Sequence, residues 1–373
     1  MILFLLIVVA AALVIEKISL RLPIKNVGYR IESSVPSAEQ GEEFFIVTTI
    51  ENRTKHNIPY LRLKEEIPGG VHLCDGEDLD FNGREHVSTL FVHQHERVRR
   101  SVRAVSCTRG MHFFTKGELS FGDFLGLKEF SCERKTSGAI LVYPRRIRSE
   151  HLNRVLGDVM GEISVQSFLF EDPMLVRGYR DYTGREPLRA VSFVQSAKRM
   201  QLTVKEYDRT RTPIANIILD MEFYGDFEHY FDQREAQVSV VRMICESFEQ
   251  RGMGYRIITN MCYPEMKTRG VNVIESEGNG DFFRILDILG VAAGVAICPA
   301  AELLSYAKSC YWGGAFLYVA QRDCEEVRAE LSRHFAGGAG MLHTFYGSEY
   351  EECYREAGAR LTGQGERKGE GAA

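Results

Sequence analysis

The hydrophobic and polar positions divide the chain into three stretches with different patterns. The first 15 residues are apolar and contain no charged side chain. From residue 26 to about 150, short runs of β-branched and aromatic residues alternate with turn residues. From residue 212 to 346, short apolar runs alternate with longer segments of helical periodicity. This order predicts a multidomain α+β protein.

The apolar run at the start predicts a membrane helix. A helix that crosses a bilayer needs about 20 mostly apolar residues, so the run of 15 is short, but it can extend to residue 22 if Glu16 and Lys17 reach the membrane interface. Lys17, Arg21 and Lys25 follow the run, and basic residues in this position tend to stay in the cytoplasm. We therefore expect residues 1–25 to anchor a single-pass protein in the cell membrane, with its body in the cytoplasm. A cleaved signal peptide is the alternative, although its usual basic start is missing here.

Residues 26–150 are predicted to form an immunoglobulin-like β-sandwich. Strand-like runs occupy 44–50, 87–92 and 98–105, and breakers such as the Pro-Gly-Gly turn at 68–70 separate such runs. No helical periodicity of useful length interrupts them. Several short strands at this spacing are typical of two packed sheets.

Residues 212–346 are predicted to form a Rossmann-like α/β domain. Strands are expected at 214–219, 255–259, 314–320 and 341–345, and helices at 233–251, 282–289, 300–308 and from Asp323 to Phe335. Alternation of this kind implies a mainly parallel sheet with helices on both faces. Asp220 ends the first strand, and such sheets bind ligands beyond the carboxyl ends of their strands.

Composition narrows the classes of function. The 373 residues are 45% hydrophobic and 26% charged, which suits about two globular domains. The formal net charge of -5 argues against a nucleic-acid partner, because a whole-surface nucleic-acid binder is usually basic. The nine cysteines are scattered and form no Cys-x-x-Cys pair, which favours buried thiols over a disulfide framework or a zinc site.

The sequence lacks the motifs of several common enzyme classes. It contains no G-x-x-x-x-G-K-[ST] loop, no H-E-x-x-H and no G-x-S-x-G. We therefore expect a protein that is not an enzyme. The residues from Gly363 onward are rich in Gly, Glu and Lys, and we expect 347–373 to be a mostly disordered tail.

Three segments in the middle of the chain resemble domain-of-unknown-function family 58. They are RGMHFFTKGELSFGDFLGLKEF at 109–130, LVYPR at 141–145, and VRGYRDYTGREPLRAVSFVQSAKRMQLTVKEY at 176–207. The resemblance implies a von Willebrand A-like module at 212–346, a family signature segment and linker at 151–211, and association with a MoxR-type AAA+ ATPase. The chain departs from the family pattern at Phe193, where a tryptophan is usual, and after Gly184, where a Gly-Asp turn is usual.

Asp220 lies where a von Willebrand A module places the aspartate of its metal-ion site. The motif of that site is Asp-x-Ser-x-Ser, whereas this chain reads DMEFY from Asp220, without either serine. Glu222 and Asp226 are the oxygen ligands available to replace the serines around Mg²⁺. The alternative is that no metal binds and that Asp220 caps the following loop.

The signature segment is the candidate interaction surface. Basic residues are interleaved there with acidic ones, which indicates either a solvated face with internal ion pairs or a docking surface for an acidic protein partner. The candidate contact residues are Arg177, Tyr179, Arg180, Arg189, Phe193, Lys198, Arg199 and Lys205.

These patterns together predict a membrane-anchored scaffold or adaptor that works with a MoxR-type ATPase in the assembly or maturation of client proteins. One alternative is a metal-dependent enzyme that uses Asp220, Glu222 and Asp226. The other is a cell-surface adhesion protein whose body lies outside the cell.

Overall fold

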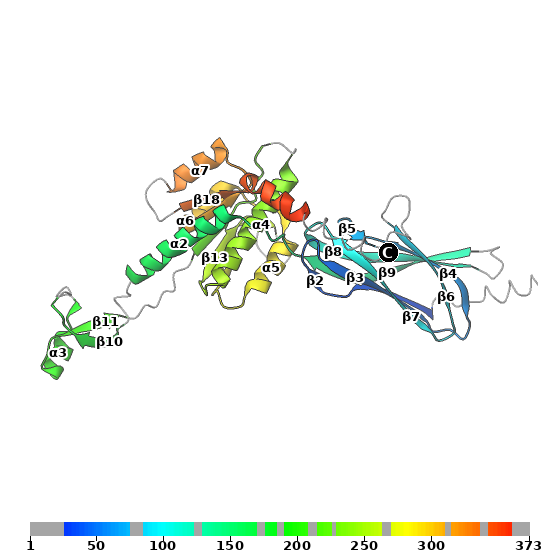
Figure 1. Ribbon diagram of the computed structural model, residues 1–373, viewed down its shortest axis with the longest axis horizontal. Helices are drawn as coiled ribbons and strands as arrows, with labels where there is room; N and C mark the ends of the chain where they lie inside the picture. Colours follow the sequence, from blue (N-terminus) through cyan, green and yellow to red (C-terminus); the bar gives the residue numbers. More distant parts are fainter. Residues whose placement is uncertain are drawn as a thin grey trace, which may run out of the picture. The chain divides into compact units, whose positions relative to one another are not determined.

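The computed structural model describes residues 26–74, 85–122, 129–169, 176–184, 190–207, 215–225, 229–262, 270–309, 315–335 and 342–359. These residues confirm a multidomain α+β chain (Figure 1). The chain divides into two compact units, with the main boundary between Arg145 and Arg146. We call them the β unit and the α/β unit.

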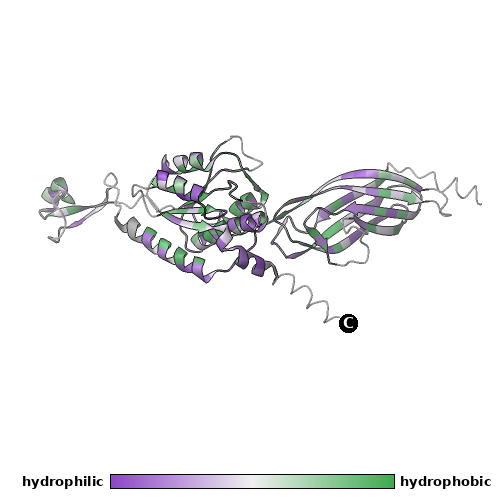
Figure 2. Ribbon diagram, turned by 90° about the horizontal axis from the view of Figure 1, so that it is seen from above, coloured by the Kyte–Doolittle hydropathy of each residue, from purple (hydrophilic) through white to green (hydrophobic). Residues whose placement is uncertain are grey.

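The β unit is a β-sandwich of two sheets. Their strand orders are β1-β3-β7-β5 and β2-β9-β8-β4-β6, and all pairings are antiparallel except the short one between β2 and β9. Hydrophobic and hydrophilic residues alternate along these strands, as Figure 2 shows, so each sheet has one apolar face. The strands are β1 (Val27–Ser33), β2 (Ser37–Ala38), β3 (Glu43–Asn52), β4 (Ile58–Glu66), β5 (Val71–Leu73), β6 (Glu85–Val92), β7 (Arg97–Ser106), β8 (Gly110–Gly122) and β9 (Glu129–Val142).

The core of the sandwich draws side chains from both sheets. Ile31 and Phe44 of one sheet belong to the same buried cluster as Phe114 and Ile140 of the other. A second cluster joins β1 and β3 to β4, β6 and β8 in the same way. The two apolar faces therefore pack against each other, which is the arrangement that defines a sandwich.

One acidic side chain is buried inside the sandwich. Glu65 is 3% exposed, and its carboxylate accepts hydrogen bonds from Thr48 Oγ1 at 2.6 Å and Tyr29 Oη at 3.0 Å. His86 Nδ1 lies 3.2 Å from the second oxygen, and His86 and Glu65 are direct partners in the β4–β6 ladder. Burial, and then the charge of Glu65, raise the pKa of Tyr29, so this hydroxyl stays a donor. Such partners offset the large cost of removing a carboxylate from water.

Gly117 provides the space that this arrangement needs. A Cβ atom at Gly117 would lie 2.5 Å from Tyr29 Oη and 2.6 Å from Tyr29 Cζ. A larger residue at Gly117 would therefore displace the ring that donates to Glu65.

The α/β unit is built on a five-stranded sheet with the order β15-β13-β12-β17-β18. The strands β12, β13, β17 and β18 are parallel, whereas the edge strand β15 is antiparallel to β13. Every residue of β12 and β17 is buried, as expected for the centre of a sheet covered on both faces. The strands are β12 (Ala215–Leu219), β13 (Tyr255–Thr259), β15 (Asn272–Ser276), β17 (Phe316–Ala320) and β18 (Leu342–Tyr346), and a small separate sheet pairs β14 (Met261–Cys262) with β16 (Ala293–Ala296).

Helices pack against this sheet. Ile218, Ile258 and Tyr318 share a buried cluster with Leu303 of α6 and Leu331 of α7. The helix α4 contacts β17 and β18, and it is buried along most of its length. The helices are α2 (Glu150–Leu169), α4 (Tyr230–Glu249), α5 (Phe282–Val291), α6 (Ala300–Ser309) and α7 (Glu325–Phe335).

The segment 151–211, predicted as a signature segment and linker, contains folded elements. It is occupied first by α2, whose buried residues Leu152, Leu156, Val159 and Ile163 recur at helical spacing. After this helix come β10 (Val176–Asp181), α3 (Phe193–Arg199) and β11 (Thr203–Tyr207). The strands β10 and β11 pair antiparallel, and we call these three elements the signature module.

The prediction of a single-pass membrane protein is contradicted. No helix among the described residues is long and apolar enough to cross a membrane. The 20-residue helices α2 and α4 are long enough, but both carry several charged side chains. The predicted anchor itself, residues 1–25, lies outside the described residues. We do not retain the membrane location or the cytoplasmic orientation.

The predicted disordered tail also needs correction in its first part. Residues 347–349 form a 3-10 turn and residues 351–359 form a helix. Tyr350, which follows the turn, and Tyr354, on the helix, are both buried although the tail is rich in charged residues. Residues 360–373 lie outside the described residues.

The substitution Gly117→Ala should destabilise the β unit by about 1–3 kcal/mol, because the added methyl group displaces the Tyr29 ring. Chemical denaturation followed by circular dichroism measures the loss. Gly69→Ala is the matched control, since a Cβ atom at Gly69 meets nothing within 4 Å. Equal stability of the two variants would show that the Tyr29 ring does not depend on Gly117.

Candidate functional site

Polar residues follow three neighbouring parallel strands of the α/β unit. Asp220 comes directly after β12, Asn260 after β13, and Gln321 after β17. The parallel registers of β12 with β13 and β17 bring these strand ends to the same edge of the sheet. This carboxyl edge is where ligands of open α/β sheets usually bind.

Asp220 is the centre of the edge, and its carboxylate is fully buried. Oδ1 accepts hydrogen bonds from Asn260 Nδ2 and from the backbone N–H of Glu222, each at 2.9 Å. Oδ2 accepts from the hydroxyls of Tyr318 at 2.6 Å and Tyr224 at 3.0 Å. Two donors on each oxygen satisfy a carboxylate that is out of contact with water.

The two tyrosines are held in the protonated form that this role requires. Burial is the main cause that raises the pKa of Tyr318, and the charge of Asp220 raises it further. The same two causes, in the same order, raise the pKa of Tyr224. Both hydroxyls therefore remain hydrogen-bond donors over the ordinary pH range.

The chain that leaves β12 is fixed by further side chains. Gln237 Nε2 of α4 donates to the carbonyl of Asp220 at 2.5 Å. The N–H of Met221 donates to Asn260 Oδ1 at 2.7 Å, and the buried Arg234 donates to the carbonyl of Met221. These bonds satisfy the backbone groups beyond the strand and fix the conformation of the loop.

Glu222 has a structural role at the start of α6. Its Oε2 accepts a hydrogen bond from the backbone N–H of Ala300 at 2.6 Å. A carboxylate in this position satisfies an unpaired N–H and interacts favourably with the helix dipole. Glu222 thus ties the loop after β12 to the neighbouring helix.

A groove of about 570 Å³ lies beside this loop. Glu222 and Tyr224 line it from the loop, Ala300 from α6, and Glu326 and Glu330 from α7. Of the ten residues that line the groove, three are acidic and none is basic, so the groove would attract a basic side chain more readily than an anion.

Two of the three predicted metal ligands are engaged by protein donors. Asp220 uses both oxygens on protein donors, Glu222 caps a helix, and Asp226 lies outside the described residues. Among the described residues, no group of three His, Cys, Asp or Glu side chains is placed to hold a metal ion. The surroundings of Asp220 do not fit a divalent cation, because cations need oxygen atoms that donors do not already occupy.

Seven of the eight predicted interaction residues fall on the signature module. The exposed fraction is 70% for Phe193, 69% for the adjacent Val194 and 94% for Met200. Among the basic residues, the side chains of Arg180, Lys198 and Arg199 are exposed, and that of Lys205 is half-buried. Tyr179 is half-buried, and its carbonyl accepts a hydrogen bond from Arg199 at 3.3 Å. Arg177 lies in β10 but its side chain is not described, and Arg189 lies outside the described residues.

Local hydrogen bonds connect the start of α3 to the start of β11. Ser196 Oγ donates to the carbonyl of Ser192 at 2.8 Å and accepts from the N–H of Thr203 at 2.9 Å. Met200 ends α3 in the left-handed conformation, with a φ of 53°. A non-glycine residue rarely adopts this conformation, and here it turns the chain between α3 and β11.

Sequence reasoning singled out Asp220 but did not predict its hydrogen-bond partners. Asn260 directly follows a strand, and that position was the signal available in the sequence. Tyr318 gave no such signal, because it reads as one more apolar residue of a buried strand.

Asp220→Ala should lower the free energy of unfolding by about 3–5 kcal/mol, because several buried donors lose their acceptor together. Chemical denaturation of the full chain measures the loss. Tyr318→Phe removes a single donor and should cost less. Asp323→Ala is the control, because its ion pair with Arg328 lies at the surface and contributes little. A wild-type midpoint for Asp220→Ala would contradict the role assigned to Asp220.

Comparison with known proteins finds only distant similarity. No family model matches the chain. The chain is 23% identical over 269 residues to the uncharacterized protein YeaD of Bacillus subtilis (strain 168), and the match covers 72% of this chain but only 62% of that relative.

The solved structures that match do so weakly. One is the CARDB domain of the PF1109 protein from Pyrococcus furiosus in complex with di-metal ions. It matches 30% of this chain and 86% of its own chain, at 9% identity and a TM-score of 0.19. Salmonella alpha-2-macroglobulin reacted with methylamine matches 31% of this chain and 9% of its own at 13% identity and a TM-score of 0.24. At these TM-scores, neither structure bears on function.

Proposed function

We propose that the chain is a non-enzymatic interaction protein, an adaptor that docks on a partner through the signature module. The observation that carries this proposal is the exposure of Phe193, Val194 and Met200 on one short element. Apolar side chains scattered singly on a surface are normal, whereas apolar side chains gathered on one element mark an interaction site. The proposal names the module as the docking surface and Phe193 as its anchor.

The free energy expected from burying these side chains supports this proposal. Complete burial of a large apolar side chain stabilises an interface by about 1.5–3 kcal/mol. Phe193 and Met200 both have most of their surface available for burial against a partner. Aromatic anchors of this kind carry a large part of the binding energy in many interfaces.

Charge indicates the kind of partner. Lys198 and Arg199 form the last turn of α3, next to Met200, and Arg180 lies on the paired strand β10. Exposed cations around an apolar anchor favour a partner surface with an apolar pocket and an acidic rim. The resemblance to family 58 suggests a MoxR-type AAA+ ATPase as that partner, with assembly or maturation of client proteins as the process.

The hydrogen bonds of the acidic side chains at the carboxyl edge support a role without catalysis. Asp220 is enclosed by donors and Glu222 is bound to a helix start, so neither side chain is available as a base, a nucleophile or a metal ligand. The edge is instead held by hydrogen bonds within the α/β unit, and its acidic groove is a second surface on which a basic segment of a partner or client would fit.

The finer fold assignments belong to the same proposal. We assign the β-sandwich to the immunoglobulin-like type and the α/β unit to the von Willebrand A-like type. Mostly antiparallel strands in two sheets support the first assignment. A largely parallel sheet with an aspartate after its central strand supports the second, although the serines of a metal-ion motif are missing.

The proposal is tested by the binding of purified full-length protein to MoxR-type ATPases of the same organism, measured by biolayer interferometry with ADP and with a slowly hydrolysed ATP analogue. Phe193→Ser should weaken binding by about tenfold or more, because the anchor loses its apolar surface.

Phe283→Ser is the matched control, since Phe283 is also 70% exposed but lies on α5. It should bind like the wild type. Failure of every such ATPase to bind in either nucleotide state would remove the ATPase from the proposal. Equal binding by Phe193→Ser and the wild type would remove the module as the docking surface.

A further inference from the structure

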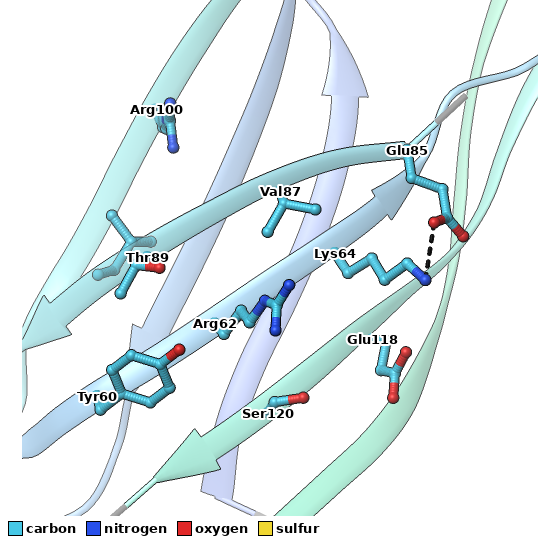
Figure 3. Close-up of a pocket in the computed structure, with 10 residues that line it drawn as sticks. Tyr60, Arg62, Lys64, Glu85, Val87, Thr89, Arg100, Glu118 and Ser120 are labelled. Carbon is cyan, nitrogen blue, oxygen red and sulfur yellow. Dashed lines mark ion pairs between the residues drawn. The ribbon is translucent and has the colours of Figure 1, made fainter. Parts of the chain in front are cut away.

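The outer face of β4, β6 and β8 contains a hollow of about 1230 Å³ (Figure 3). It is lined by cations and carboxylates together, namely Arg62, Lys64, Arg100, Glu85 and Glu118, and Lys64 pairs with Glu85 at 2.7 Å. Mixed charges of this kind do not select one class of ligand. A loop of the α/β unit, by contrast, contains the groups of a defined reaction.

This loop carries a sequence that favours spontaneous deamidation. Residues 277–281 read EGNGD and connect β15 to α5. Asparagine is a chemically labile residue, and a glycine after it favours the reaction, because no side chain hinders attack by the glycine nitrogen on the asparagine side chain. A second Asn-Gly pair, Asn82-Gly83, lies outside the described residues.

The structure presents the asparagine of this loop to water. Asn279 is exposed, and the glycines on both sides have positive φ values, 75° for Gly278 and 106° for Gly280. Such conformations favour glycine, so the shape of the turn requires both of them. A Cβ atom at Gly280 would meet nothing within 4 Å, so the space beside this residue is open.

One carboxylate holds the loop. Glu249, the last residue of α4, accepts a hydrogen bond through Oε2 from the backbone N–H of Gly280 at 3.1 Å. Its Oε1 accepts from Ser276 Oγ at 2.7 Å and from Tyr255 Oη at 3.0 Å. Ser276 Oγ in turn accepts from the N–H of Gly278 at 3.1 Å. Both glycines of the turn are thus tied, directly or through one hydroxyl, to the same carboxylate.

The contact with Glu249 restrains the atom that would react. Deamidation requires the Gly280 nitrogen to lose its proton and to approach Cγ of Asn279. While the N–H of Gly280 donates to Glu249, the peptide plane is held with its hydrogen directed at the carboxylate. Hydrogen bonds to an ionised acceptor are stronger than neutral ones, and this one must break before the ring can close. Glu249 therefore slows the reaction.

We propose that Asn279 is a site of spontaneous deamidation and that Glu249 sets its rate. The Gly280 nitrogen bonds to Cγ of Asn279, the bond from Cγ to Nδ2 breaks, and ammonia leaves with the proton of the Gly280 amide. Water then opens the succinimide at one of its two carbonyls and gives aspartate or isoaspartate. Water is the only co-reactant in these steps.

The product changes the charge of the turn. A new carboxylate at position 279 lies two residues from Glu277 on one side and two from Asp281 on the other. Repulsion between these groups and Glu249 weakens the hydrogen bond that Gly280 donates. In the isoaspartate form the backbone also gains a methylene group. Both products are therefore expected to loosen the connection between β15 and α5.

The test incubates the purified full chain in a mildly alkaline buffer and follows the tryptic peptide 270–284 by mass spectrometry. Asn279 should acquire the mass change of an amide replaced by a carboxylate, in aspartate and isoaspartate forms. Asn272 is the internal control in the same peptide, because it is buried on β15 and the branched Val273 follows it. Asn272 should remain unchanged.

Glu249→Ala releases the Gly280 N–H and should convert Asn279 several-fold faster than the wild type. Glu249→Gln, which keeps the size of the side chain but loses its charge, should give an intermediate rate and serves if the alanine variant does not fold. Glu246→Ala is the matched control, because Glu246 is also an acid of α4 but pairs with Arg146. It should react at the wild-type rate.

Three results would overturn the proposal. The first is an unchanged Asn279 in the wild type and in both Glu249 variants. The second is a rate in the folded Glu249 variants that is equal to or below that of the wild type. The third is conversion of Asn272 as fast as that of Asn279.

Discussion

The α/β unit depends on the solvation of one buried charge, the carboxylate of Asp220. Removing a carboxylate from water costs several kcal/mol, and donors must replace the lost water. Here Asn260, Tyr318 and Tyr224 supply them from the end of β13, from β17 and from the following loop. The carboxylate thereby links β13 and β17 to β12, the strand that ends directly before Asp220. The need to satisfy this carboxylate explains why these polar side chains meet at the carboxyl edge.

The β-sandwich satisfies its own buried carboxylate in a similar way. Glu65 is enclosed by donors from Tyr29 and Thr48 and lies beside His86, as Asp220 is enclosed by its tyrosines. Both acids are committed to the fold, and the groups left available lie on surfaces. The clearest such surface is formed by the exposed apolar side chains of the signature module. This contrast between two enclosed carboxylates and an exposed apolar surface is the basis of the proposal that the chain is an interaction protein.

The order of the elements could be predicted from the sequence, because buried strands and amphipathic helices have clear periodicities. The apolar run before Asp220 predicted β12, and the helical spacing of Val238, Val241 and Cys245 predicted α4. The helix α2 was missed although its buried residues show the same spacing. The partners of Asp220 could not be predicted, because Asn260 and Tyr318 are distant in sequence and become neighbours only through the strand order.

The most direct test of the central claim is calorimetric titration of the purified full chain and of Asp220→Asn with Mn²⁺. If the carboxylate is fully occupied by Asn260, Tyr318 and Tyr224, both proteins should give the heat of dilution alone. Saturable binding of one ion per chain in the wild type, lost in Asp220→Asn, would show that Asp220 is a cation ligand and would contradict the account.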